Sequence, residues 1–228
     1  MVNPVSELTV QALKEYDTAT VSNAIEAFNV RDRTEGYASG SLACQYPDLP
    51  PMVGFAITCT ADSTTQGPKR KNNRHALFDA IAAAPKPVVV IIQNVGPNVE
   101  RSCFLGDMVA AASQQLGAVG VVTDGGVRDR SGIRQRAPGF QLFSTGVVAS
   151  RGSSTYLDVN VPVSICGLEI EPGDLLHGDE SGLVKIPLDI AAEVSVQSGE
   201  IIEQETKLFD LLASGNATLD TIKDHLKG

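Results

Sequence analysis

The sequence predicts a single α/β domain. Two apolar, β-branched runs at 88–92 and 118–123 are typical of strands buried on both faces, and an alanine-rich helical stretch at 107–116 lies between them. A strand, a helix and a strand in this order form a βαβ unit with parallel strands. From 159 to 186, short strands divided by Pro-Gly and Gly turns predict a β-rich meander that packs on this unit. No internal repeat or linker-like tract divides the sequence.

The N-terminal third is expected to hold helices around one strand. Residues 6–28 show a broken helical period, and hydroxyl residues between 18 and 22 could mark a break with a fresh N-cap, which would give two short helices. Residues 31–51 are rich in Gly, Ser, Asp and Pro and predict a long loop. A strand is expected over 52–61, and a short helix over 75–84, ended by proline.

The C-terminal half continues the pattern beyond the βαβ unit. Residues 128–136 predict a short helix or turn, and strands are expected over 140–144 and 147–150. After the meander, residues 188–213 predict a long amphipathic helix, and 219–226 a short final one.

Composition limits the kinds of partner. The 228 residues include 18 Lys and Arg against 27 Asp and Glu, a formal charge of −9, which argues against nucleic acid and against an anionic membrane surface. The four cysteines form no CxxC pair, so structural zinc is not expected. No apolar run approaches the roughly 20 residues of a membrane span, and the first residues do not resemble a signal peptide. We therefore expect a cytoplasmic protein without a membrane partner.

Two glycine-marked turns are the candidate site. One is Gly106-Asp107, at the start of the helical stretch, and the other runs from Gly125 to Asp129 after the second buried run. Ligands of open α/β sheets lie beyond the carboxyl ends of the strands, so the two turns should be neighbours in space. Unpaired amides at the start of a helix can also hold a carboxylate.

Arg128 and Asp129 supply the chemistry of this candidate site. An arginine can grip a carboxylate with two parallel hydrogen bonds, and a single aspartate with mostly water ligands suits Mg²⁺ or Mn²⁺ better than zinc. Each turn also has a plainer interpretation. Gly106-Asp107 could be only a helix start, and Arg128 with Asp129 only an exposed ion pair on a loop. The convergence of the two turns favours a site for a metal-assisted reaction on a small anionic substrate.

Several motifs resemble the RraA-like family, which includes class II 4-hydroxy-4-methyl-2-oxoglutarate and 4-carboxy-4-hydroxy-2-oxoadipate aldolases. Residues 18–25 resemble its N-terminal helix motif, and 54–58 its first strand. Gly106-Asp107, followed after twenty residues by Arg128-Asp129, is similar to its central signature, and the segment 172–187 to its C-terminal hairpin.

The resemblance implies a fold, an assembly and a set of roles. The fold would be an αββα sandwich of swivelling β/β/α type, formed by residues 1–228 as a single domain. The assembly would be a homotrimer or homohexamer. The apolar positions of the long helix suit packing of the C-terminal helices, about 188–228, at a subunit interface, although packing within the chain's own core would explain them equally well. The residues implied to line the substrate site are Gly106, Asp107, Met108 and Val109. Arg128 would bind the 2-oxo acid and Asp129 would hold the divalent metal.

The chain departs from the aldolase signature at one position. That signature continues with two residues and then an acid after the Arg-Asp pair, and here the position is Gly132. Some relatives also complete the site with a glutamate from a neighbouring subunit, for which Glu203 or Glu205 is the candidate here.

Three functions follow from these observations. The leading hypothesis is a Mg²⁺- or Mn²⁺-dependent lyase that cleaves a C–C bond in a 4-hydroxy-2-oxo dicarboxylate and releases pyruvate, with oxaloacetate decarboxylation as a related activity. Arg128 and Asp107 would be its catalytic residues. The alternatives are a non-catalytic regulator that binds a ribonuclease, which Gly132 favours because regulators in the family also lack the acid, and a metal-dependent dehydratase of a sugar or hydroxy acid.

Overall fold

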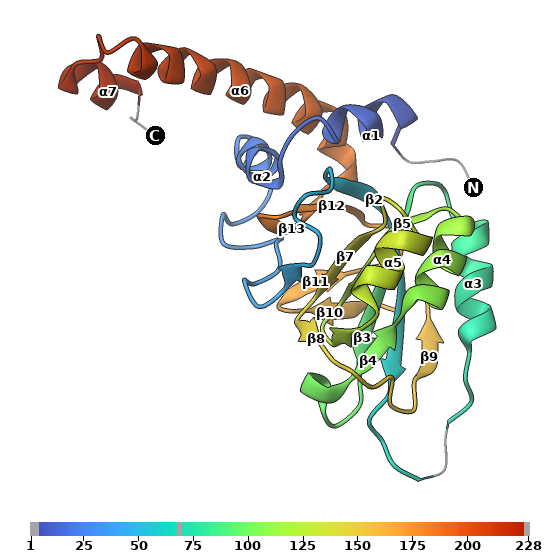
Figure 1. Cartoon of the computed structure of the whole chain (residues 1–228). Coiled ribbons are helices and arrows are strands. Elements are labelled where there is room, and N and C mark those ends of the chain that lie inside the picture. Colours follow the sequence, from blue (N-terminus) through green and yellow to red (C-terminus); the bar gives the residue numbers. More distant parts are fainter. Residues whose placement is uncertain (1–4, 68–69, 226–228) are drawn as a thin grey trace.

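A curved sheet of eight strands forms the centre of the molecule in the computed structural model, which describes residues 5–67 and 70–225 (Figure 1). Four neighbouring strands run parallel in the order β7-β5-β3-β2. Their bounds are β2 Met52–Asp62, β3 Val88–Asn94, β5 Ala118–Thr123 and β7 Gln141–Ser144. The two β-branched runs are therefore adjacent parallel strands, as the sequence predicted.

Strand β3 shows why these runs are apolar throughout. Val88, Val90 and Ile92 contribute to one hydrophobic core, and Val89 and Ile91 to another on the opposite face of the sheet. Successive side chains of a strand point to opposite faces, so the part of β3 that is covered on both sides, 88–92, has no polar positions.

Helices cover one face of the sheet and a β-hairpin covers the other. Leu77 of α3 (Arg74–Ala83), Ala110 of α4 (Asp107–Gln115) and Ile133 of α5 (Arg130–Arg136) pack in the first core. The hairpin of β10 (Val163–Ile165) and β11 (Leu168–Ile170) packs in the second.

The sheet curls until its two ends approach each other. The hairpin of β12 (Leu175–Asp179) and β13 (Gly182–Ile186) extends it antiparallel to β2, and β1 (Ala43–Cys44) closes the β7 edge. A β-carbon at Gly178 of β12 would lie 2.9 Å from the Phe143 ring of β7. Tyr37 also bridges to Val184 of β13. The result is a nearly closed, barrel-like sheet.

A third core joins the N- and C-terminal helices to the β12–β13 hairpin. Helices α1 (Glu7–Leu13) and α2 (Thr18–Glu26) pack there against the start of α6 (Ala191–Ala213), which follows a short 3-10 turn at Leu188–Ile190. The break expected within 6–28 is confirmed, but the cap is Asp17 and not one of the hydroxyl residues between 18 and 22. Its carboxylate accepts from the Thr20 amide at 2.8 Å.

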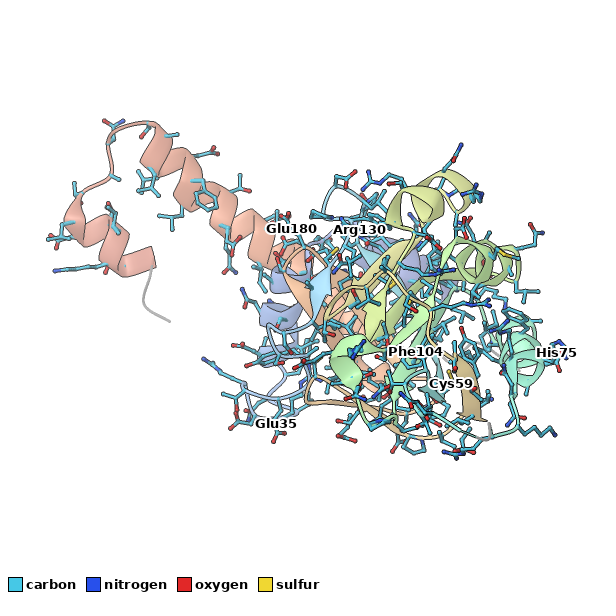
Figure 2. The ribbon with its side chains drawn as sticks, turned by 60° about the horizontal axis from the view of Figure 1, so that its bottom comes forward. Glu35, Cys59, His75, Phe104, Arg130 and Glu180 are labelled. Atoms are coloured by element: carbon cyan, nitrogen blue, oxygen red, sulfur yellow. The ribbon has the colours of Figure 1, made fainter. Side chains whose placement is uncertain are left out.

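Helix α6 then leaves the body of the molecule. Figures 1 and 2 both show α6 and α7 (Leu219–His225) extending away from the part that carries the sheet. Several of its large apolar side chains are exposed, including Phe209 at 63%. Of the helices in the described ranges, none has the length and apolarity to cross a bilayer.

Some sequence expectations were wrong in detail. The strand expected over 147–150 is limited to β8 (Gly146–Val147), and the loop expected over 31–51 contains β1. Strand β9 (Thr155–Val159), which pairs with the second half of β2, was not expected. Only β10 and β11 pack on the core as a separate hairpin, because β12 and β13 join the main sheet.

Candidate functional site

The candidate site lies at the end of a second, small parallel sheet. This sheet contains β4 (Cys103–Leu105), β6 (Gly126–Val127) and β8 in that order. Leu105 pairs with Val127, so the carboxyl ends of β4 and β6 lie side by side. The Arg128 amide continues the ladder by donating to the Leu105 carbonyl at 3.2 Å. The prediction that the two glycine-marked turns are neighbours is confirmed.

Gly106 is the point where the two turns touch. A β-carbon at this position would lie 2.8 Å from Asp129 Oδ2 and 3.3 Å from Arg128 Nε. The backbone there is extended, with φ −134°, which any residue can adopt. Glycine at this position leaves space for the two charged side chains, which a β-carbon would displace.

Arg128 and Asp129 act as one pair because of an unusual backbone at the second residue. Asp129 is left-handed, with φ 56° and ψ 33°, and is the N-cap residue of α5. Aspartate tolerates this conformation better than most residues. The turn brings Arg128 Nε within 3.3 Å of Asp129 Oδ2, and the two side chains are 34% and 39% exposed. Both remain accessible to a ligand.

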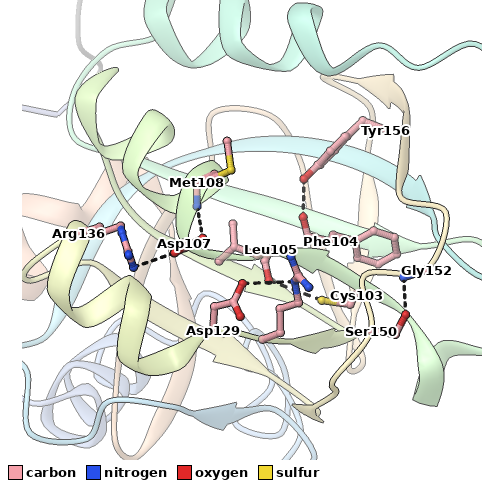
Figure 3. Close-up of polar contacts among 11 residues, drawn as sticks. Cys103, Phe104, Leu105, Asp107, Met108, Asp129, Arg136, Ser150, Gly152 and Tyr156 are labelled. Carbon is pink, nitrogen blue, oxygen red and sulfur yellow. Dashed lines mark hydrogen bonds and ion pairs between the residues drawn. The ribbon is translucent and has the colours of Figure 1, made fainter.

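The first turn of α4 supplies backbone donors next to this pair. Asp107 Oδ1 already accepts the Met108 amide at 2.8 Å, as Figure 3 shows. The amides of Asp107 and Val109 have no acceptor within the described residues. Met108 is 81% exposed, whereas the Val109 side chain packs against the first core and leaves only its amide for a ligand.

The other oxygen of Asp107 is held by a residue that the sequence analysis did not single out. Arg136 Nη1 of α5 lies 2.8 Å from Asp107 Oδ2 (Figure 3). Gly132 lies one helical turn before Arg136, and a β-carbon there would be 2.9 Å from Arg136 Nη1 and 3.0 Å from Asp107 Oδ2. The four-residue spacing of 132 and 136 on a helix was the signal that could have identified Arg136.

The donor set is compatible with a divalent cation held mainly by water and substrate. Asp129 Oδ2 faces Arg128, and Asp129 Oδ1 has no partner among the residues that the structure describes. Within those residues no three His, Cys, Asp or Glu side chains converge as a metal-binding group. One accessible carboxylate oxygen suits Mg²⁺, which commonly keeps several waters and one or two carboxylates.

A second polar group, Asp124, directly follows β5. Asp124 Oδ1 accepts the Asn94 amide at 2.6 Å. Burial raises the pKa of the Asp124 carboxyl to about 6, against the opposing effect of the amides of Asn94 and of Asp124 itself. Its contacts are with the neighbouring strand, so we assign it a structural part in joining β3 to β5.

The two glutamates considered for the site are on α6. Glu203 and Glu205 are exposed there. Figure 1 shows α6 running away from α4 and α5, so within one chain these residues do not meet Arg128.

The chain is similar over most of its length to known sequences. A sequence profile of the RraA-like family, described as Aldolase/RraA, matches residues 18–185. Protein DlpA of Legionella pneumophila is 27% identical over 221 residues, which are 95% of this chain and 33% of that protein. The 4-hydroxy-4-methyl-2-oxoglutarate aldolase of Thermus thermophilus is 32% identical over 87 residues, which are 38% of this chain and 52% of that protein. The chain thus spans about half or less of these two relatives.

The fold has a counterpart among solved structures. Streptomyces coelicolor RraAS2, described as an unusual member of the RNase ES inhibitor RraA protein family, superposes with a TM-score of 0.64. The superposition covers 90% of this chain and 96% of that chain at 23% identity, which supports the shared single-domain α/β fold alone. The profile match, which covers residues 18–185, shows that the chain belongs to the RraA-like family.

Proposed function

We propose that this protein is a divalent-metal-dependent lyase that cleaves a C–C bond in a 4-hydroxy-2-oxo dicarboxylate and releases pyruvate. The observation that carries the proposal is the placement of Arg128 and Asp129 on Gly106, beside the free amides of Asp107 and Val109. This arrangement offers hydrogen-bond donors and a cation ligand at one accessible point. Decarboxylation of oxaloacetate would use the same groups, because it also leaves a pyruvate enolate.

The proposed reaction is a reverse aldol cleavage. A base removes the proton from the C4 hydroxyl, the C3–C4 bond breaks, and its electron pair moves toward the 2-oxo group to give the enolate of pyruvate. Protonation of that enolate at C3 yields pyruvate, and the former C4 becomes a carbonyl in the second product. The main requirement on the protein is stabilisation of the negative charge that develops on the 2-oxo oxygen.

Arg128 and the α4 amides are suited to this requirement. The terminal nitrogens of Arg128 have no acceptor among the described residues, so they can donate to the substrate's C1 carboxylate and 2-oxo oxygen. The Asp107 and Val109 amides lie at the positive end of the α4 dipole and add further donors. These donors are fixed before the substrate arrives, which is what makes them effective in the transition state.

Asp129 would hold the divalent cation, Mg²⁺ or Mn²⁺. When bound, such an ion supplies Lewis-acid polarisation of the substrate oxygens. Asp129 is set for this role by its left-handed backbone, which turns its carboxylate toward Gly106.

Asp107 would orient a water that takes the hydroxyl proton. Its oxygens already accept from the Met108 amide and from Arg136, so the carboxylate is fixed in one orientation. A fixed carboxylate can hold a water in a defined position, and the water then carries the proton transfer.

We also propose that the working form is a homotrimer or homohexamer, with α6 at the interface. The exposed apolar residues of α6 support this proposal; they include Val196 at 65%, Phe209 at 63% and Leu212 at 42%. Apolar side chains that are exposed on a projecting helix do not stabilise a monomer, and such surfaces commonly mark a protein–protein interface. A neighbouring copy could bring Glu203 or Glu205 to the site, and analytical ultracentrifugation of the wild type and Phe209→Ser would test the interface.

A coupled assay for pyruvate tests the catalytic proposal. The wild type should release pyruvate from 4-hydroxy-4-methyl-2-oxoglutarate with Mg²⁺ and lose this activity with EDTA. Arg128→Ala should abolish turnover while the oligomer stays folded. Arg134→Gln is the control, because it removes an exposed arginine of α5 that pairs with Asp48 and stacks on the Tyr46 ring rather than contacting the candidate site. Full activity in Arg128→Ala would refute the role of this residue.

The second candidate is a regulator that binds a ribonuclease, and Gly132 is the observation that favours it. Measuring both ribonuclease binding and pyruvate release on the same purified protein distinguishes the two functions. Ribonuclease binding without pyruvate release from any 2-oxo dicarboxylate, with metal present, would support the regulator and exclude the lyase.

A further inference from the structure

Gly132 and Arg136 lie outside the Gly106-Asp107 and Arg128-Asp129 signature, but both lie next to Asp107. The absence of a side chain at Gly132 leaves a space beside Asp107, and the Arg136 guanidinium fills it. An acid at position 132 would begin from a β-carbon 2.9 Å from Arg136 Nη1. Such an acid would pair with Arg136 and cancel its charge, so glycine at this position keeps Arg136 available.

Arg136 has unused hydrogen-bonding capacity directed to solvent. Its side chain is 55% exposed, and only Nη1 has an acceptor among the described residues, namely Asp107 Oδ2. Nε and Nη2 can therefore donate to a ligand without breaking the contact with Asp107. The guanidinium is anchored on one side and free on the other, which lowers the entropy lost when it binds an anion.

Two such arginines flank the first turn of α4. Arg128 lies against Gly106, at the N-cap position, and Arg136 lies against Asp107, the first helical residue. Figure 3 shows Arg136 and Asp107 pointing toward each other, with Asp129 close by. The two arginines thus contact consecutive residues at the start of α4, where the Asp107 and Val109 amides have no acceptor among the described residues.

The charges of this cluster also suit a ligand with two negative charges. Arg128 and Arg136 formally balance Asp107 and Asp129. A divalent cation on Asp129 would leave an excess of two positive charges, which one dianionic ligand neutralises and a monoanion does not.

We propose that Arg136 binds the distal carboxylate of the substrate while Arg128 binds the C1 carboxylate, so that the site selects dianionic over monoanionic 2-oxo acids. This inference rests on the proposed function, since it assigns a specificity-determining residue to the same site. Arg128 would then hold the part of the substrate that becomes the pyruvate enolate, and Arg136 would hold the part on the C4 side of the bond that breaks.

Isothermal titration calorimetry with Mg²⁺ present separates this role from general electrostatics. The probes are pyruvate, with one carboxylate, and 2-oxoglutarate, with a second carboxylate at its far end. In Arg136→Gln, the Kd of 2-oxoglutarate should rise about tenfold or more, the effect of losing one charge-assisted contact. The Kd of pyruvate should change less than about threefold.

Arg134→Gln is the matched control, since it removes the same charge from the same helix, but Arg134 contacts Asp48 and the Tyr46 ring instead of Asp107. It should leave both Kd values unchanged. Gly132→Asp should imitate Arg136→Gln by placing an acid against the guanidinium, and both variants should keep the circular dichroism spectrum of the wild type.

The outcomes distinguish this inference from the proposed function. Equal weakening of both ligands in Arg136→Gln, or no weakening, would overturn the role of Arg136 and leave the lyase proposal intact. A wild type that binds neither pyruvate nor 2-oxoglutarate with Mg²⁺ would overturn both. Selective loss of 2-oxoglutarate in Arg136→Gln and Gly132→Asp, but not in Arg134→Gln, would support the assignment.

Discussion

Replacement of Gly106 by alanine tests whether the position of the Arg128–Asp129 pair controls the chemistry. The new β-carbon would lie 2.8 Å from Asp129 Oδ2 and 3.3 Å from Arg128 Nε. Ordinary contact between such atoms begins near about 3.4 Å, so the carboxylate must retreat by about 0.6 Å. The extended backbone at φ −134° accepts alanine without strain, so the fold itself should not change.

The expected cost is on activity rather than on stability. A misplacement of about 1 Å at a reacting centre costs about 100-fold in rate, so a shift of about 0.6 Å should lower kcat/KM by about 10- to 100-fold. This corresponds to about 1.4–2.7 kcal/mol of transition-state stabilisation. The free energy of unfolding should change by less than about 1 kcal/mol, because the affected side chains are partly exposed.

The assay is pyruvate release with Mg²⁺, combined with urea unfolding of each variant. Gly146→Ala is the control, because a β-carbon at Gly146 of the same small sheet has no neighbour within 4 Å. Wild-type kcat/KM in Gly106→Ala would show that the contact between the two turns does not set the geometry of the reaction. Equal losses in both glycine variants would trace the effect to the small sheet in general.

Three further substitutions test the structure around the site. Tyr156→Phe removes the buried hydroxyl that donates to the Phe104 carbonyl at 2.5 Å, and should lower the free energy of urea unfolding by about 1–3 kcal/mol. Asp124→Asn should raise Tm relative to wild type at pH 8, because burial raises the pKa of Asp124 to about 6 and disfavours its ionised form. The stability of the wild type therefore falls as pH rises toward that pKa, so the Tm advantage of Asp124→Asn should be smaller at pH 5 than at pH 8. An equal advantage at both pH values would show that ionisation of Asp124 is not the cause. Asp17→Ala should cost about 1 kcal/mol at pH 7 by loss of the α2 cap. Burial raises the pKa of Asp17, but the hydrogen bonds from Thr20 outweigh this effect, and the net pKa is below its ordinary value. The stabilisation by the cap is therefore present at neutral pH and should disappear as pH falls below about 4. A cost of Asp17→Ala that does not depend on pH would contradict the assignment.

The large elements of the fold could be predicted because their signals are local and repeated. The β-branched run at 88–92 became β3, and the run at 118–123 became β5, with residues 107–115 as the helix between them. Each of these segments is long enough to show a period, and each is covered on the faces that its apolar positions indicate.

The support of the site could not be predicted in the same way. Strands β4, β6 and β8 have two or three residues each, too few to show alternation, and their pairing joins segments far apart in the sequence. The turns were expected beyond the main sheet, whereas they follow this small sheet. The convergence was predicted correctly, but the element that causes it was not.

Arg136 was overlooked for a related reason. In the sequence it is one of several arginines after Asp129, and nothing there separates it from surface charge. Its partner Asp107 is 29 residues away, and the contact depends on α4 and α5 packing side by side. Only the combination of the empty position at Gly132 and this packing distinguishes Arg136 from Arg134.

The left-handed backbone of Asp129 has a consequence for every substitution made there. Alanine would remove the carboxylate and also penalise the conformation that starts α5, by about 1–2 kcal/mol, so the Arg128 side chain would lose its setting as well. Asparagine tolerates that conformation and changes the charge alone, while glycine frees the backbone and removes the side chain. Both replacements remove the negative charge, so the loss shared by the two variants measures the anion, and any further loss with glycine measures the fixed backbone and the presence of a side chain at this position.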